Sequence, residues 1–243
     1  MKMDWRLPVR MISAVVFAVA LGILAWLMYE SWENTQLNRI LASQRPEVVN
    51  APIGEDGIMD SFRDLLAQNS DTIGWLTIDG TSIDYVVMQS PDEPDKYLHR
   101  DFNGSESRWG ALFVAEDCDV KTSDNIIIYG HHMRDGSMFG ALAEYESAEY
   151  CAAHPNVRFD TIYGPGRYEI VAVVRTDVST FPFYDYTQAN DPETFAEYAA
   201  FLQENSIYDT GRTLQAGDKI LTLSTCNYHT ANGRLIVVCR KTA

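Results

Sequence analysis

Hydrophobic residues are concentrated first in one long run near the N-terminus. Residues 11–29 (MISAVVFAVALGILAWLMY) form a stretch of 19 residues without a formal charge. A helix of that length spans about 28 Å, close to the hydrocarbon thickness of a bilayer. Lys2, Arg6 and Arg10 precede the run, and positively charged flanks stay on the cytoplasmic side. The pattern therefore predicts a cytoplasmic N-terminus over residues 1–10, a transmembrane signal-anchor over 11–29 and an extracellular remainder.

A cleaved signal peptide is the main alternative for this run. Its apolar core would usually hold ~7–15 residues, with small residues at the cleavage site. Here the run is longer, and the bulky residues Trp26, Leu27, Met28 and Tyr29 occupy its end. An uncleaved anchor is therefore favoured. The length and the N-terminal position also argue against a buried core helix.

A weaker helical pattern follows the apolar run. Apolar residues recur at near-helical spacing from Trp32 until Pro46 interrupts them. This predicts a membrane-proximal helix and stalk over residues 30–55. The folded domain is expected over 56–243, and a short amphipathic helix in residues 56–71 opens it.

Beyond this helix, alternating and β-branched patterns replace the helical one. Short β-branched or aromatic runs are divided by Gly, Asp, Asn, Ser or Pro, as is typical of strands. Their number and short length predict a mainly β fold, either a barrel or a sandwich. The runs are GWLTIDG, IDYVVMQ, ALFVAED, NIIIYGH, NVRFDTIY, YEIVAVVRT, KILTLSTC and LIVVCRK.

One helix is predicted late among these strands. Asp191 is a good N-cap, and Pro192 suits the first helical position. An apolar stripe with i, i+3, i+4, i+7 spacing follows, and we expect it to lie on the sheet. The stripe consists of Phe195, Tyr198, Ala199 and Leu202.

Composition and charge narrow the functional classes. The chain is 46% hydrophobic and 22% charged, which excludes a disordered protein. Its net charge is −15, from 19 basic and 34 acidic residues. A nucleic-acid partner is not expected, because such binding needs a basic surface. The sequence also contains no glycine-rich phosphate loop, so nucleotide chemistry has no support.

Neither a metal nor another cofactor is expected. The sequence has no C-x-x-C, H-x-x-x-H or H-E-x-x-H motif, so a zinc site would need ligands scattered over the fold. The four cysteines, at 118, 151, 226 and 239, fit two disulfides in an oxidising compartment. They are too sparse for a disulfide scaffold.

Cys226 is the strongest candidate nucleophile. In KILTLSTC the side chains alternate between two faces, and the thiol ends the strand. A hairpin can bring Arg234, the first residue of the next run, back beside it. A guanidinium there would favour the thiolate and could donate hydrogen bonds to an oxyanion. For Cys226 taken alone, a small buried hydrophobe is the plainer interpretation.

A cysteine nucleophile also needs a proton shuttle, for which histidine is suited. His131 and His132 follow a buried strand, and because adjacent side chains diverge, at most one can point at a given thiol. His229 lies three residues after Cys226, where it could border the pocket. The other two histidines, His99 and His154, lie in polar segments where solvation is expected.

Two motifs together resemble those of a known family. LTLSTC, followed by Arg234, resembles the T-L-x-T-C motif and downstream arginine of sortases, the membrane-anchored transpeptidases of Gram-positive cell envelopes. YGHHMRDGSMFGAL resembles the histidine motif of class B sortases. The similarity covers roughly residues 55–241. It implies an eight-stranded sortase-type β-barrel with N-terminal helices and a long helix before the cysteine strand.

The resemblance also implies a mechanism and a set of site residues. A class B sortase cleaves a C-terminal sorting motif after threonine, forms a thioacyl intermediate and transfers the protein to an amine. The implied partners are secreted proteins with sorting motifs, a peptidoglycan cross-bridge or lipid-linked precursor amine, and the membrane. DEPDKYL departs from the family, with Pro94 and Asp95 where relatives often have asparagine. The implied catalytic residues are Cys226, His131 and Arg234, and the implied substrate-binding residues are Tyr129, Ser224 and Leu98.

Three alternatives remain at this point. Within the family, a pilin-polymerising sortase would use a lysine of another subunit as the acceptor. A non-catalytic, membrane-tethered binding ectodomain could join Cys226 and Cys239 in a structural disulfide. Strand alternation argues against that pairing, because Arg234 and Cys239 should point to opposite faces. A papain-like protease would need a different sequence around the cysteine and a histidine after it.

Overall fold

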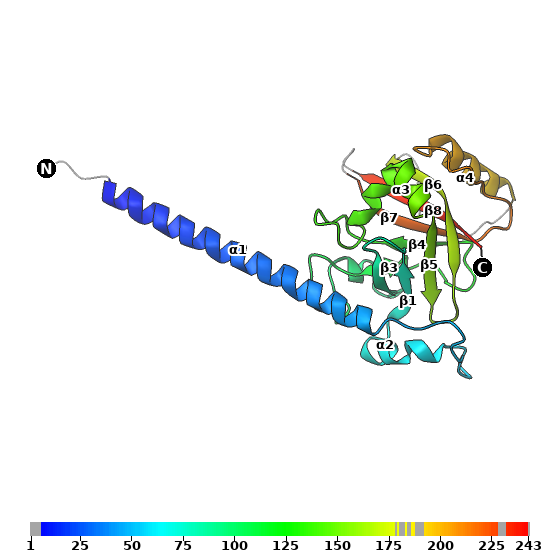
Figure 1. Cartoon of the computed structure of the whole chain (residues 1–243), viewed down its shortest axis with the longest axis horizontal. Helices are drawn as coiled ribbons and strands as arrows, with labels where there is room; N and C mark the ends of the chain where they lie inside the picture. The colour runs from blue at the N-terminus through cyan, green and yellow to red at the C-terminus, as the bar shows by residue number, and fades with distance from the viewer. Residues whose placement is uncertain are drawn as a thin grey trace. The chain divides into compact units, whose positions relative to one another are not determined.

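In the computed structural model, the N-terminal helix is continuous through the predicted anchor and the segment after it. The structure describes residues 6–177, 179, 183, 186–187, 192–227 and 232–242. Helix α1 (Arg6–Ser43) is a single helix of 38 residues (Figure 1), long and apolar enough to cross a membrane. The helix continues past residue 29 without a break, because no glycine or proline occurs between residue 29 and its end at Ser43.

The compact unit of the chain begins earlier than the sequence pattern indicated. It spans Gln44–Ala243, so residues 44–55 belong to it. Ile53 bridges to Met59, and the backbone N–H of Asp60 donates to the carbonyl of Pro52 at 2.9 Å. These bonds join the segment to the short amphipathic helix predicted next. That helix consists of a 3-10 turn, η1 (Asp60–Phe62), and α2 (Arg63–Gln68).

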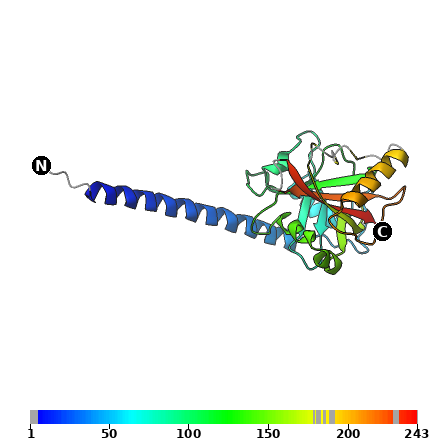
Figure 2. The same cartoon turned by 90° about the horizontal axis from the view of Figure 1, so that it is seen from above.

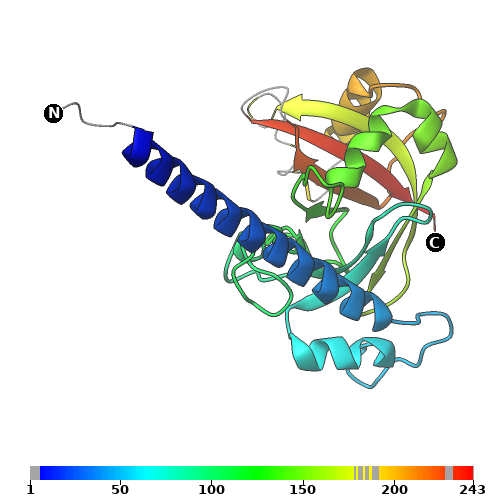
Figure 3. The same ribbon diagram turned by 60° about the vertical axis from the view of Figure 1, so that its left-hand side comes forward.

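All eight predicted runs form strands, and the strands close into a barrel. The order around the barrel is β1-β2-β3-β4-β7-β8-β6-β5, with β5 pairing back onto β1. The predicted eight-stranded β-barrel is therefore confirmed. Figure 3 shows the long strands β6 and β8 side by side. The strands are β1 (Thr72–Thr77), β2 (Asp84–Met88), β3 (Leu112–Val114), β4 (Asn125–Tyr129), β5 (Asn156–Thr161), β6 (Arg167–Asp177), β7 (Ile220–Cys226) and β8 (Gly233–Lys241).

Most neighbouring strands are antiparallel, and the parallel pair β4–β7 matters most for the site. β4 and β7 run side by side in the same direction, although more than 90 residues separate them in the sequence. Parallel neighbours end at the same edge of a sheet. The residues that follow β4 therefore lie beside the last residues of β7.

The late helix forms as predicted and covers part of the barrel. Helix α4 (Pro192–Asn205) begins at the expected proline and packs against β6 (Figure 2). Phe195, Tyr198 and Leu202 of the predicted stripe are buried. The Tyr198 ring stacks on Tyr186 with centroids 4.0 Å apart. The proposed N-cap, Asp191, lies outside the described residues.

Two short elements between β4 and β5 escaped the sequence pattern. These are η3 (Gly140–Glu146) and α3 (Ala148–Ala153), and the Ser147 side chain caps α3 by accepting a bond from the Tyr150 N–H. Elements of six or seven residues give too few turns for a clear helical period. Burial of Leu142, Tyr145 and Cys151 holds them on the core.

A buried polar pair fixes the parallel strands to each other. The Thr222 hydroxyl donates to Asn125 Oδ1 at 2.9 Å, and Asn125 Nδ2 donates to the Tyr186 carbonyl at 2.9 Å. Asn125 and Thr222 are both fully buried. A buried polar group that loses its partner costs free energy, so this pair favours one pairing of β4 with β7.

Replacing Asn125 by alanine should destabilise the barrel. The Thr222 hydroxyl and the Tyr186 carbonyl would both lose a buried partner, which costs about 1–3 kcal/mol of unfolding free energy. Thr222→Val keeps the side-chain shape and serves as the milder comparison. Denaturant titration of the full chain in detergent, followed by tryptophan fluorescence, measures both. Equal stability of Asn125→Ala and the wild type would show that the pair contributes nothing.

Candidate active site

The thiol and the guanidinium are placed by one antiparallel strand pair. β7 ends at Cys226, β8 begins at Gly233, and the register sets Cys226 directly opposite Arg234. Cys226 is partly exposed at the rim of the barrel. The guanidinium of Arg234 donates to its own neighbour, the Gly233 carbonyl, at 3.0 Å. The hairpin loop that contains His229 lies outside the described residues.

The imidazole comes to the same edge from the parallel strand β4. Tyr129 pairs with Ser224 across β4 and β7, and His131 and Cys226 each lie two residues further along. Side chains two residues apart point to the same face. The Gly130 N–H donates to the Ser224 carbonyl at 3.2 Å, and the Thr225 hydroxyl donates to the Gly130 carbonyl at 2.8 Å. These two bonds hold the chain before His131 against the chain before Cys226.

A backbone carbonyl orients the ring of His131. Its Nε2 lies 2.7 Å from the carbonyl oxygen of Leu98. A neutral imidazole bonded in this way donates its Nε2 proton and keeps the Nδ1 lone pair free to accept one. The ring of His99 lies nearby, with centroids 6.4 Å apart. His99, expected to be solvated, is exposed but is also a neighbour of the candidate catalytic histidine.

Leu98 is itself held by a polar network beneath it. It ends the 3-10 helix η2 (Lys96–Leu98). The Lys96 ammonium and the Tyr97 hydroxyl each donate to Asp71 at 2.8 Å. Burial, with the adjacent Asp71 carboxylate, raises the pKa of Tyr97 to about 12, so this hydroxyl remains a donor. Asp71, directly before β1, thereby holds η2 in place, and with it the Leu98 carbonyl that orients His131.

A second network supports Asn227, the residue that follows Cys226. Asn227 Nδ2 donates to Glu146 Oε1 at 3.0 Å, and Arg175 forms an ion pair with the same carboxylate. Hydrogen bonding to Arg175 lowers the pKa of Glu146, and the charge of His132 also lowers it. The carboxylate therefore remains ionised at neutral pH. His131 lines the cavity, whereas His132 is not among its lining residues.

These side chains surround a cavity of about 380 Å³. Tyr129 and Ser224 both line it, and burial raises the pKa of Tyr129. The Ser224 hydroxyl oxygen has no hydrogen-bond partner in the described part of the chain, although the residue is only 1% exposed. A buried hydroxyl left unpaired favours a ligand group that can bond to it. The cavity is lined by Asp95, Leu98, Phe113, Glu116, Tyr129, Gly130, His131, Phe183, Ser224, Thr225, Cys226 and Arg234.

All six residues singled out in the sequence line this cavity. Several further lining residues were not proposed from the sequence. Phe113 lies on β3 and Glu116 follows it closely. The sequence pattern of this segment predicted a strand, but it could not show which strand would be its neighbour. Glu116 could have been singled out from the sequence because it is an acidic residue that directly follows an apolar run. Asp95 was noted only as a departure from the family pattern.

The other three cysteines are buried and carry free thiols. Burial raises the pKa of Cys118 to about 12, and it also raises the pKa of Cys239. Cys239 is opposite Leu221, five residues before Cys226 on β7. The structure therefore contains neither the two possible bridges nor the alternative Cys226–Cys239 disulfide. Within the described residues, no group of three or more His, Cys, Asp or Glu could hold a metal ion.

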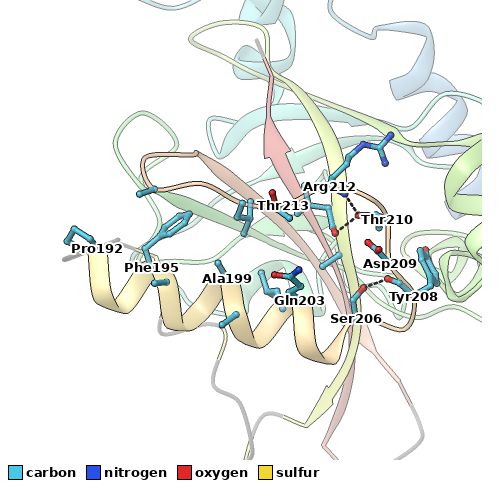
Figure 4. A pocket seen from close by; sticks show the side chains of 17 residues that line it. Pro192, Phe195, Ala199, Gln203, Ser206, Tyr208, Asp209, Thr210, Arg212 and Thr213 are labelled. Atoms are coloured by element: carbon cyan, nitrogen blue, oxygen red, sulfur yellow. Dashed lines mark hydrogen bonds between the residues drawn. The ribbon is translucent and has the colours of Figure 1, made fainter.

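A larger cavity, of about 570 Å³, lies between α4, β6 and the segment that leads to β7. Figure 4 shows its lining, where the Ser206 hydroxyl donates to the Tyr208 carbonyl. Arg212 pairs with Glu169 rather than facing a ligand. The lining contains neither cysteine nor histidine. The larger cavity therefore has no side chain suited to act as a cysteine nucleophile or a histidine base, and cavity size alone does not identify the candidate active site.

Comparisons with known proteins identify the architecture. A model of the sortase domain matches residues 76–242. Sortase B of Listeria monocytogenes is 36% identical over 185 residues, covering 74% of this chain and 73% of the relative. Sortase B from Bacillus anthracis, solved in complex with AAEK1, is 31% identical with a TM-score of 0.76, covering 88% of this chain and 99% of that one. Sortase B of Clostridium perfringens gives 29% identity and a TM-score of 0.69, with 74% and 99% coverage.

The barrel and these matches show that the chain belongs to the sortase family. Within that family it is a class B sortase, a cysteine transpeptidase of the cell envelope. The family acts on proteins that bear sorting motifs and on cell-wall amines. The expected class and activity are therefore confirmed.

The native protein should present a single reactive thiol. Cys226 is partly exposed, whereas the other three cysteines are buried, and burial protects a thiol from alkylation. Under non-reducing conditions, iodoacetamide should add one group to the native chain and four to the denatured chain, as read by intact mass. Cys226→Ala should remove the native label. Only two labels on the denatured wild type would reveal a disulfide.

Proposed function

We propose that this chain is a membrane-anchored class B sortase that cleaves a sorting motif after threonine and transfers the protein to a cell-wall amine. The supporting observation is the meeting of Cys226, His131 and Arg234 in one cavity, from three strand ends at one edge of the barrel. A thiol, an imidazole and a guanidinium are the nucleophile, the proton shuttle and the oxyanion donor that acyl transfer requires.

In the first half-reaction, the Cys226 thiolate attacks the carbonyl carbon of the threonine. Arg234 and nearby backbone N–H groups bind the oxyanion that forms. His131 then donates a proton to the leaving nitrogen, so the C–N bond breaks and a thioester remains. The Leu98 carbonyl would stabilise the protonated imidazole, because that ring can donate from Nε2 while Nδ1 carries the transferred proton.

In the second half-reaction, the acceptor amine attacks the thioester carbonyl. His131, now neutral, accepts a proton from the amine. The C–S bond breaks, an amide bond forms and Cys226 leaves as thiolate. Water would yield hydrolysis at the same step, so productive transfer requires that the amine occupy the cavity ahead of it.

Three residues that line the cavity provide the proposed substrate contacts. Ser224 offers a buried hydroxyl that has no hydrogen-bond partner in the part of the chain that the structure describes. Tyr129 lies beside it on β4 and presents an aromatic surface with a hydroxyl. Leu98 contributes an apolar side chain next to the carbonyl that orients His131. These three residues would hold an extended peptide across the strand ends.

The long N-terminal helix suits enzymes whose substrates are retained at the same surface. We place residues 1–10 in the cytoplasm, the membrane span at 11–29, a membrane-proximal segment after it up to residue 43, and the extracellular catalytic domain from Gln44 onward. The apolar N-terminal helix supports a membrane anchor, and the basic residues before it support an orientation with the N-terminus in the cytoplasm. Anchoring raises the effective concentration of membrane-held sorting proteins and lipid-linked amines.

Cys226→Ala should abolish the thioester while the barrel remains folded. The full chain in detergent is incubated with a library of peptides containing an internal threonine and with candidate amines, and mass spectrometry records the thioester and the products. Cys118→Ala is the matched control, since it removes a thiol outside the cavity. Peptide cleavage by Cys226→Ala would show that another group is the nucleophile. A ladder of linked subunits with native clients would instead indicate pilin polymerisation.

Arg234→Lys should lower kcat/KM by about 100-fold or more, the usual effect of losing an oxyanion donor. An ammonium cannot reproduce the planar fork of donors, even though the charge is kept. Arg240→Lys is the control on the same strand, because Arg240 pairs with Glu169 outside the cavity. Steady-state cleavage of one peptide compares the two variants. Equal losses would point to a general effect on β8.

A further inference from the structure

The chain after His131 folds back on itself as a hairpin. The Phe139 N–H donates to the His131 carbonyl at 3.0 Å, and His132 forms an antiparallel β-bridge with Met138. We call residues 131–139 the histidine hairpin. Because its closing hydrogen bond ends on His131 itself, a shift of the hairpin would also shift the backbone that carries the imidazole.

One residue of the histidine hairpin has a strained backbone. Met138 has a φ of 51°, in the left-handed region. Residues with a Cβ rarely lie there, because the Cβ comes too close to a backbone carbonyl oxygen, and asparagine and aspartate are the usual exceptions. A strained residue keeps such a conformation only where surrounding contacts hold it. The contacts of Met138 therefore show what keeps the hairpin in shape.

Tyr85, on strand β2, supplies one of these contacts. Its hydroxyl oxygen accepts the Met138 N–H at 3.1 Å, and its ring packs against the hydrophobic core, which fixes the hydroxyl in place. Met138 is only 2% exposed, so water cannot easily replace this acceptor. A buried N–H that loses its partner is costly. The Tyr85 bond therefore favours the strained conformation over a relaxed one.

A second contact attaches the tip of the same hairpin. The Ser82 hydroxyl, in the turn before β2, donates to the Gly136 carbonyl at 3.0 Å. Ser82 is exposed, so water competes for this bond and it contributes less than the Tyr85 bond. Neither Ser82 nor Tyr85 lines the active-site cavity. An effect of either residue on the reaction would therefore pass through the histidine hairpin or through the stability of the fold.

The histidine hairpin completes the support of the imidazole. The Leu98 carbonyl bonds to Nε2 of the His131 ring, and the Gly130 N–H, just before this residue, donates to the Ser224 carbonyl of β7. These two contacts hold the ring and the backbone that enters His131, whereas the hairpin holds the backbone that leaves it. The direction of Nδ1, which carries the proton in the proposed first half-reaction, depends on all three.

We propose that Tyr85 is a positioning residue, which aims the Nδ1 proton of His131 at the leaving nitrogen of the peptide by holding Met138 and the histidine hairpin. The inference rests on the proposed transpeptidase function. Proton transfer requires the donor to lie within about 2.6–3.2 Å of the acceptor atom, and a misplacement of about 1 Å costs up to about 100-fold in rate. Attack by the Cys226 sulfur takes no proton from His131, so it should depend on Tyr85 much less.

Two substrates with different leaving groups separate these steps. Full-length enzyme in detergent is mixed in excess with a peptide that the wild type cleaves after threonine, or with the same peptide ending in a threonine p-nitrophenyl ester. In the first substrate the C–N bond breaks and the departing nitrogen takes the proton of His131. In the second the C–O bond breaks and nitrophenolate leaves without a proton. Mass spectrometry follows the single-turnover rate of thioester formation on Cys226, and alkylation by iodoacetamide measures the reactivity of the thiolate alone.

Tyr85→Phe should lower the rate with the amide about 10- to 100-fold and leave the rates with the ester and with iodoacetamide within about 2-fold. The phenylalanine ring still fills the space of the tyrosine ring. Ser82→Ala should act in the same direction by only about 2- to 5-fold, because its bond is exposed. Thr210→Val is the matched control. The Thr210 hydroxyl also accepts a backbone N–H, that of Arg212 at 3.3 Å, but it lies at the larger cavity.

Equal amide rates in Tyr85→Phe and the wild type would overturn the inference. Equal losses with the amide and the ester would overturn it too, because the damage would then not be specific to proton transfer. The same conclusion follows if Thr210→Val lowers the amide-to-ester ratio as much as Tyr85→Phe does. If Tyr85→Phe does not fold, Ser82→Ala decides, and an unchanged ratio in that variant rejects the inference. The transpeptidase proposal fails separately, if the wild type forms no thioester on Cys226 with any peptide or ester.

Discussion

The parallel pairing of β4 with β7 is the constraint on which the site depends. Its register sets Tyr129 beside Ser224, and the two-residue period of extended chain then sets His131 and Cys226 on the same face at the same edge. A slip of one residue would turn one of these side chains to the opposite face. The buried bond between Thr222 and Asn125 and the bond from Thr225 to Gly130 oppose such a slip. The register of β4 against β7 therefore determines both the packing inside the barrel and the positions of His131 and Cys226 at its edge.

The groups around Cys226 are held by elements far apart in the chain. The Leu98 carbonyl orients His131 and depends on Asp71 at the start of β1. Glu146, in a segment with no clear sequence pattern, holds Asn227 directly after Cys226. The surroundings of Cys226 and His131 are therefore held by hydrogen bonds between distant segments.

Much of the fold could be predicted, because the barrel strands are short, β-branched and separated by turn residues. All eight appear where those runs lie, and α4 begins at its predicted proline. The limits of the prediction were also physical. The elements η3 and α3 are too short to show a period, and α1 runs through the boundary placed after residue 29, because that boundary was set by hydropathy and not by a helix-breaking residue. Similarly, residues 44–55 are held by backbone bonds to the domain, which leave no hydrophobic signature.

The sequence by itself determined the strands, the apolar helix, the family resemblance and the three candidate catalytic side chains, because each depends on local pattern or on a short motif. Tertiary structure decided which strands are neighbours, and hence that Glu116 and Asp95 share a cavity with Cys226. It also decided that the Ser224 hydroxyl has no partner among the described residues and that a carbonyl from η2 meets His131. Strand order and side-chain pairing depend on contacts between distant segments, which the periodicity of a single segment does not encode.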